Sequence, residues 1–164
     1  MPADGQANKG ISDLDRLILQ TLQKDGRTPF TQIARQTGVS ETTIRDRYRQ
    51  LVEHGIVHTV GIVDPYALGF LAPAILGISV EPSLVDEVAR AIAELPEVSY
   101  QVMTLGSFDL IVEVFCRDLP HLSQLITERI YRIPGVRSTE TLMIARSYKL
   151  TYRWSPSLEG GAGA

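Results

Sequence analysis

TQIARQTGVSETTIRDRYRQLVEHG, residues 31–55, decides the fold of the N-terminal part of this 164-residue chain. The stretch predicts two short helices around a turn at Gly38, where a positive φ is often needed and glycine adopts it without steric cost. Ser40 follows as a natural N-cap for the second helix. Apolar side chains then recur at helical spacing and mark the buried face of that helix, namely Ile44, Tyr48 and Leu51. The pattern is typical of a helix-turn-helix, whose second helix enters the DNA major groove.

The outward face of this second helix carries the candidate DNA contacts. With Ile44 inward, 3.6 residues per turn direct Thr42, Arg45, Asp46 and Arg49 outward. Arg45 is the first choice for a guanine contact, because a guanidinium can bond O6 and N7 together. Asp46 either accepts from a cytosine amino group or steers Arg49, and Arg47 either holds a phosphate or braces the domain. The predicted DNA-binding residues are Ser40, Thr42, Thr43, Arg45, Asp46, Arg47 and Arg49.

The flanking segments complete a DNA-binding module over residues 11–63. An isolated motif of this kind can be an ordinary helical hairpin with a charged, solvated face. Here, however, Ser12 and Asp15 form a capping-box-like start for a preceding helix. After Gly55, residues 56–63 are rich in β-branched side chains and predict a strand or small wing. Three helices and a short β segment together favour a winged helix-turn-helix that binds double-stranded DNA.

The charge distribution supports the same interpretation. Residues 27–49 hold five arginines against Glu41 and Asp46, a net charge of +3, whereas the whole chain carries −3. An acidic protein is a poor candidate for coating nucleic acid indiscriminately. A local basic patch instead suits a dimer that places two small reading heads on one site. Phosphate neutralisation then supplies much of the affinity and makes it depend steeply on salt.

The remainder of the chain alternates strand and helix patterns. Residues 64–70 form a linker, and residues 71–154 predict a second domain. Its expected elements are strands over 74–81, 98–105 and 110–116, helices over 84–95 and 119–133, and a long strand or strand pair from 136 to about 152. This βαββαβ order is the ferredoxin-like arrangement, so the fold class is α+β.

Assembly follows from the two faces of this sheet. Its two helices can cover only one face, yet residues 110–116 place Val112 and Val114 on one side and Ile111 and Phe115 on the other. An apolar sheet face left in water is a large exposed patch, which soluble monomers avoid. We therefore expect a homodimer formed through the C-terminal domain, which also suits a pseudo-palindromic DNA site.

Several classes of protein and site are not supported. The chain has no run of about 18 apolar residues that would span a membrane, and no secretion signal at its start. The single cysteine, Cys116, excludes an internal disulfide and reads as core packing in a cytoplasmic protein. The three histidines lack metal-ligand spacing, so no metal site is expected. No cofactor and no catalytic residue is expected either. Residues 1–10 and 155–164 are small and polar, and are expected to be disordered.

Four segments together resemble the Lrp/AsnC family, the feast/famine transcription regulators. They are LDRLILQTLQKDGR (14–27), GVSETTIRDRYRQLVEHGIV (38–57), GSFDL (106–110) and the PGV-x-x-T-x-T passage from Pro134 to Thr141. The resemblance covers nearly all of the chain. It implies a winged reading head joined to a ligand-sensing αβ domain, dimers that assemble further into tetramers or octamers, and control by amino acids or related small molecules.

The resemblance also implies an effector pocket. In the family it is built partly from a G-x-aromatic-D hairpin, which maps onto Gly106, Ser107, Phe108 and Asp109, and partly from the last strand, which here offers Leu142, Met143 and Ile144. Asp109 can pair with an α-ammonium, and backbone N–H groups near Gly106 can hold a carboxylate. Ser107 replaces an acidic residue of the founding member, which leaves the ligand's identity open. A hairpin turn needed only for folding is the alternative.

The expected function is sequence-specific transcriptional regulation, with DNA binding or assembly modulated by a small effector. One alternative is a haem-pathway decarboxylase on the same two-domain plan. That chemistry needs basic or histidine residues around a large cavity, and the C-terminal domain has only His121 and no nucleophile–base pair. Another is an interaction module that has lost DNA binding, against which the three arginines of the second helix argue.

Overall fold

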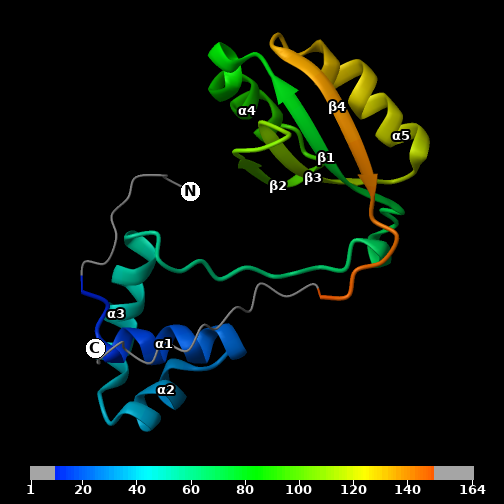
Figure 1. Cartoon of the computed structure of the whole chain (residues 1–164). Coiled ribbons are helices and arrows are strands. Elements are labelled where there is room, and N and C mark those ends of the chain that lie inside the picture. Colours follow the sequence, from blue (N-terminus) through cyan, green and yellow to red (C-terminus); the bar gives the residue numbers. More distant parts are fainter. Residues whose placement is uncertain (1–9, 150–164) are drawn as a thin grey trace, which may run out of the picture. The chain divides into compact units, whose positions relative to one another are not determined.

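The computed structural model describes residues 10–149, which form two compact units that meet in sequence at residue 63 (Figure 1). The first unit holds described residues 10–62, and the second is Val63–Lys149. Apart from Gly10, the ends expected to be disordered lie outside the described residues. The same holds for the last residues of the expected C-terminal domain.

Three helices build the first unit: α1 (Asp13–Lys24), α2 (Phe30–Thr37) and α3 (Glu41–Glu53). The predicted capping box starts α1, since the Ser12 hydroxyl accepts the Asp15 N–H and the Asp15 carboxylate accepts the Ser12 N–H. One side chain or more from each helix enters a shared core, in which Ile18, Ile33 and Ile44 are fully buried. Between α2 and α3, Gly38 adopts φ 73°, so the turn needs the left-handed conformation that glycine supplies.

The expected wing is wrong for the described chain. Residues 57–63 form no strand, and nothing in residues 10–149 pairs with them. β-branched side chains favour extended backbone, but a strand exists only where a neighbour accepts and donates its hydrogen bonds. The segment does contact the helices: the Val57 N–H donates to the Leu51 carbonyl at 3.3 Å, and the Tyr48 and Thr59 hydroxyl oxygens lie 2.9 Å apart.

The second unit has the predicted βαββαβ order. Its elements are β1 (Ala72–Val80), α4 (Val85–Ala93), β2 (Val98–Met103), β3 (Leu110–Cys116), α5 (Leu119–Gln124) and β4 (Val136–Met143), with short 3₁₀ turns at Tyr66–Leu68 and Pro82–Leu84. The strands form one sheet in the order β2-β3-β1-β4, and every neighbouring pair is antiparallel. This is the ferredoxin-like topology.

The boundaries of several elements differ from expectation, mainly at C-terminal ends. The helix expected over 119–133 is α-helical only to Gln124, then continues as a π turn (Leu125–Arg129) and a 3₁₀ turn (Ile130–Arg132). Apolar spacing predicts that a helix continues but does not report one extra residue in a turn. β2 ends at Met103 rather than at residue 105, and β4 ends at Met143, so the long final strand is shorter than expected.

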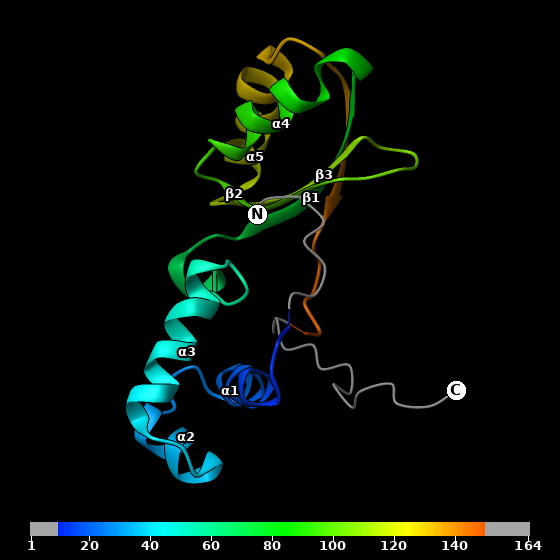
Figure 2. The ribbon, with the colours of Figure 1, turned by 90° about the vertical axis from the view of Figure 1, so that its left-hand side faces the viewer.

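Helices α4 and α5 both lie on one face of the sheet (Figure 2). Side chains facing these helices, such as Leu76, Val112 and Val114, are fully buried. Alternate residues face the other way: Ile111 and Phe115 on β3 and Ile75 on β1 are only half-buried. The sheet therefore has apolar side chains on both faces, as the sequence predicts, and no helix of this unit covers the second face. We call this second face the open face.

Candidate nucleic-acid interface and effector site

Ser40 and Thr43 fix the start of α3. The Ser40 hydroxyl accepts the Thr43 N–H at 3.1 Å, and the two hydroxyl oxygens lie 2.9 Å apart. Capping of this kind satisfies backbone groups that the first helical turn leaves unpaired. Both side chains stay exposed beside Thr42, so the N-terminal end of the helix is open to a ligand. Helix N-termini of this type bind phosphate oxygens.

The outward face of α3 is as predicted. Ile44 and Leu51 point into the core, whereas Thr42, Arg45, Asp46 and Arg49 are exposed. Two ion pairs run along this face, Arg45 with Glu41 at 2.5 Å and Arg49 with Asp46 at 3.3 Å. The second pair matches the expectation that Asp46 steers Arg49. Pairs this exposed contribute little stability, so they hold the guanidinium groups weakly and leave them available.

Arg45 has a second neighbour that the sequence did not indicate. Its guanidinium carbon lies 5.4 Å from the centroid of the Phe30 ring, the first residue of α2. The Phe30 ring in turn packs against Tyr48, with centroids 5.1 Å apart. A cation over an aromatic face is attracted by the ring quadrupole, which orients the planar guanidinium. The four-residue spacing of Glu41 and Arg45 is a sequence signal for their ion pair, but no sequence signal indicates the contact with Phe30.

Arg47 has a different environment and braces the domain. Its Nε donates to Asp15 Oδ1 at 2.9 Å, a terminal nitrogen forms a short contact with Asp15 Oδ2, and another donates to Gln50 at 3.2 Å. Asp15 is 2% exposed and lies on α1, so this ion pair joins α1 to α3. Burial raises the pKa of the Asp15 carboxyl, but hydrogen bonds from Arg47 and Ser12 outweigh that effect and the pKa lies below its ordinary value. Of the two roles open for Arg47, the structure favours the brace over a phosphate contact.

The GSFD segment belongs to the six-residue connection between β2 and β3. Thr104 closes it, since its N–H donates to the Asp109 carbonyl at 2.9 Å and its hydroxyl donates to the Phe108 carbonyl at 2.6 Å. Leu105, Gly106 and Ser107 are exposed at the tip. The connection is thus a closed loop with a free tip, which we call the hairpin.

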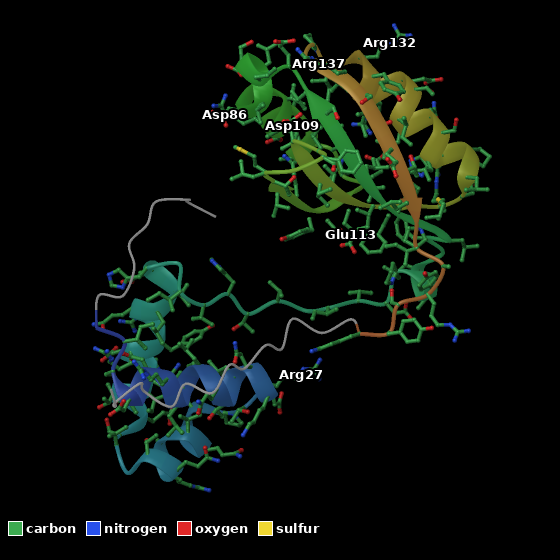
Figure 3. All side chains as sticks on the ribbon, viewed as in Figure 1. Arg27, Asp86, Asp109, Glu113, Arg132 and Arg137 are labelled. Carbon is green, nitrogen blue, oxygen red and sulfur yellow. The ribbon has the colours of Figure 1, made fainter. Side chains whose placement is uncertain are left out.

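Asp109 and Phe108 anchor the hairpin to β1. Val80 donates its N–H to Asp109 Oδ2 at 2.7 Å, and the Asp109 N–H donates to the Ile78 carbonyl at 3.0 Å. Figure 3 shows the Asp109 side chain beside the sheet. The Phe108 ring lies over Gly77 so closely that a Cβ there would come within 2.6 Å of a ring carbon. One carboxylate oxygen of Asp109 is therefore structural, and Gly77 is a site residue that the sequence did not single out.

The three β4 residues expected in the effector site do not share one face. Leu142 lies opposite Ile75 on the open face, where Phe108 covers Gly77 two residues further along β1. Met143 lies opposite Ala74, on the side of the sheet that the helices cover. Ile144 follows the end of β4 and donates its N–H to the Pro73 carbonyl at 3.0 Å. Successive strand side chains alternate, so Leu142 can join Phe108 in a pocket while Met143 points away from it.

Within residues 10–149 there is no group of three or more histidine, cysteine, aspartate or glutamate side chains placed to hold a metal ion. Cys116 is buried, and burial, with smaller contributions from Glu97 and Asp118, raises the pKa of its thiol to about 11. A protonated buried thiol is a packing group rather than a nucleophile. No described helix is long and apolar enough to cross a membrane.

Two family models match the chain: the AsnC-type helix-turn-helix domain over residues 11–52 and the Lrp/AsnC ligand binding domain over residues 73–154. The chain belongs to the Lrp/AsnC family of transcriptional regulators. The first match ends within α3, and the second begins in β1 and contains the hairpin. The decarboxylase alternative has no support among these matches.

The names of individual relatives agree with this family assignment. An uncharacterised HTH-type transcriptional regulator of Pyrococcus abyssi is 34% identical over 143 residues, covering 87% of this chain and 90% of that protein. The regulator LrpA of Pyrococcus horikoshii is 34% identical over 140 residues, covering 85% and 99%.

Solved structures share the fold. AsnC of Escherichia coli is 29% identical, covers 86% of this chain and 96% of its own, and superposes with a TM-score of 0.76. A feast or famine regulatory protein of Mycobacterium tuberculosis, complexed with L-methionine, is 25% identical, covers 90% and 100%, and has a TM-score of 0.81.

Proposed function

We propose that α3 reads a specific double-stranded DNA sequence, with Arg45 as its principal base contact. The observation that supports this most is the division of α3 into a buried Ile44–Leu51 stripe and an exposed face with Thr42, Arg45, Asp46 and Arg49. Arg45 lies near the N-terminal end, the part of a recognition helix that reaches base edges. Ser40 and Thr43 at the helix start are placed to contact phosphates, and Arg47 acts indirectly by bracing α3 against α1.

We further propose that two copies associate through the open face. Tyr100 is 50% exposed there, and Ile75, Ile111 and Phe115 add apolar area. Pairing this face with the same face of a second copy removes the patch from water through a twofold interface. The twofold places two reading helices on one pseudo-palindromic site, and tetramers or octamers extend the same arrangement.

The effector in this proposal is a free amino acid bound at the hairpin. The exposed Gly106–Ser107 tip offers N–H groups to a carboxylate, the second Asp109 oxygen is available to an ammonium, and Phe108 and Leu142 supply apolar surface. The relative complexed with L-methionine supports this ligand class. Binding alters DNA affinity only if two assemblies hold the effector with different strength, typically by about 1–3 kcal/mol.

Arg45→Ala tests the DNA-reading role. An operator is first selected from random duplexes by the full-length protein, and affinities are then measured by fluorescence anisotropy at fixed salt. We expect the variant to bind that operator about 1–3 kcal/mol more weakly and to lose discrimination at one base position.

Arg90→Ala is the matched control, because Arg90 is an exposed arginine on α4 in the other unit. It removes the same charge and should leave operator affinity unchanged. Equal binding by Arg45→Ala and the parent would overturn the assignment of α3.

A further inference from the structure

A cavity of about 220 Å³, lined mainly by charged and polar residues, lies in the αβ unit beside α5. It opens between the start of β2, the end of β3 and the π turn, and its lining includes Glu97, Arg117, His121 and Leu125. The hairpin lies at the other end of β3. The seven residues of β3 span about 24 Å, so this cavity is separate from the proposed effector site.

The π turn at Leu125–Arg129 forms one wall of this cavity. The N–H of Ile130 reaches the carbonyl of Leu125, five residues earlier, instead of following the α-helical pattern throughout. π turns are rare, and they are found frequently at functional sites. Here the turn places the 1% exposed Leu125 in the lining and lets Arg129 reach across to Glu97.

The ionic groups deepest in the cavity already satisfy one another. Arg129 donates to both carboxylate oxygens of Glu97 at 3.1 and 3.0 Å, and His121 Nε2 lies 3.3 Å from the same carboxylate. His121 Nδ1 accepts the Arg117 N–H at 3.2 Å, which assigns the ring proton to Nε2. Glu97 is therefore a compensated charge and is not available to a ligand.

Two charges of opposite sign remain on the cavity wall. The Arg117 guanidinium forms no ion pair with a carboxylate in residues 10–149, and Glu128 receives only the Gln124 amide at 3.0 Å. The two arginines and two glutamates that line the cavity cancel to zero net charge. A simple anion would meet Glu128, and a simple cation would meet Arg117. A dipolar ligand with a charge of each sign meets neither conflict.

We propose that this cavity binds a free α-amino acid with an apolar side chain. Its carboxylate pairs with Arg117, its ammonium pairs with Glu128, and its side chain lies against Leu125. Charge-assisted contacts of this kind are the strong ones in a partly enclosed site. The regulator then has two places where it senses small molecules, and this one stands whether or not the hairpin binds an effector.

The test uses full-length protein with ¹³C-labelled leucine methyl groups, titrated with L-methionine and followed by NMR. Leu125 reports on the cavity, and Leu105 reports on the hairpin tip. We expect the Leu125 signal to shift saturably, and the shift to require roughly tenfold more ligand in Arg117→Gln and in Glu128→Gln. The decarboxylated amine and the deaminated acid derived from methionine should each bind at least tenfold more weakly than methionine.

Arg132→Gln and Glu87→Gln are the matched controls, because both side chains are exposed and neither lines the cavity. Figure 3 shows Arg132 pointing into solvent. A shift of Leu105 without one of Leu125 would overturn this proposal and leave the hairpin effector intact. A shift of the Leu125 signal alone would support this proposal and count against effector binding at the hairpin. Equal binding of the deaminated acid would make the cavity an anion site and overturn the proposal.

Discussion

Arg45 and Arg47 lie two positions apart on α3, yet their surroundings differ. Arg45 is held at the surface by Glu41 and the Phe30 ring, whereas Arg47 is drawn inward to the buried Asp15. The helical angle predicted which arginine faces outward. The partner of Arg47 was not predictable, because it lies 32 residues away in the chain and the pairing depends on how α1 packs against α3.

Arg47→Ala should destabilise the helix-turn-helix unit by about 2–3 kcal/mol at neutral pH, because it leaves a buried carboxylate without its cation. Urea unfolding followed by circular dichroism measures the change. The variant should also lose operator affinity in proportion to its unfolded fraction, unlike Arg45→Ala, which should keep the parent's stability. A fully stable Arg47→Ala protein would contradict the brace.

The ion pair between Asp15 and Arg47 also makes the stability of this unit depend on pH in the acid range. The pKa of Asp15 is lowered in the folded state, so its contribution is fully present above the ordinary aspartate value of 3.8 and is lost as the pH falls through the lower folded pKa. The free energy of unfolding should therefore fall below about pH 4. Asp15→Asn should be less stable than the parent at pH 7 and should show a weaker fall, because it has no carboxyl at this position to protonate.

Glu41→Gln should strengthen DNA binding. Glu41 holds the Arg45 guanidinium and places a negative charge on the surface that meets phosphates. Removing the charge frees Arg45, and since exposed ion pairs are worth about 0.2–1 kcal/mol, we expect affinity to rise up to roughly fivefold at low salt. Glu53→Gln, near the other end of α3, is the control. Weaker binding by Glu41→Gln would show that Glu41 positions Arg45 productively rather than competing for it.

At the scale of elements, Gly77 and the hairpin depend on each other. Gly77 lies in the middle of β1, where glycine is usually unfavourable because it has no side chain to pack. The Phe108 ring, 31 positions along the chain, occupies the space that a Cβ would need. The hairpin itself was predictable from its residues, but the contact that seats it on β1 was not.

Gly77→Ala should displace the Phe108 ring and destabilise the αβ unit by about 1–3 kcal/mol, the usual cost of overpacking. Thermal unfolding measures the loss, and effector binding at the hairpin should weaken with it. Gly61→Ala is the control, because a Cβ there meets nothing within 4 Å and the backbone has no positive φ. Equal melting temperatures for both variants would contradict the seating of Phe108 on Gly77.

At the scale of the whole molecule, the open face is the surface through which we propose that two copies associate. Figure 3 shows Glu113 on the sheet, where its carboxylate accepts from the Ser99 hydroxyl at 2.6 Å among mainly apolar neighbours. A charged side chain within an apolar face is tolerable in an interface when it keeps a hydrogen bond.

Ile111→Lys should break the dimer, since it places an unpaired ammonium on the open face and burying it there would be costly. We expect the dissociation constant of the dimer to rise at least tenfold, as measured by light scattering after size exclusion. Operator affinity should fall as the dimer is lost. Ala91→Lys, on the exposed side of α4, is the control. A dimeric Ile111→Lys protein would contradict the open-face interface.

The amino-acid sequence by itself determined the order of elements, the helix-turn-helix, the outward face of α3 and the ferredoxin-like topology. These depend on local quantities: apolar spacing of about 3.6 or 2, N-caps such as Ser40, and a glycine at the αL position of Gly38. Such signals act over a few residues and are therefore readable without knowing which distant segments meet.

Only the tertiary structure decided the pairings across the chain. It seats Arg47 on Asp15 and Phe108 on Gly77, separates Met143 from Leu142, leaves residues 57–63 without a strand partner, and gathers Glu97, Arg117 and Glu128 around one cavity. Each of these depends on packing between residues far apart in sequence, and a strand or an ion pair exists only when its partner is brought within reach.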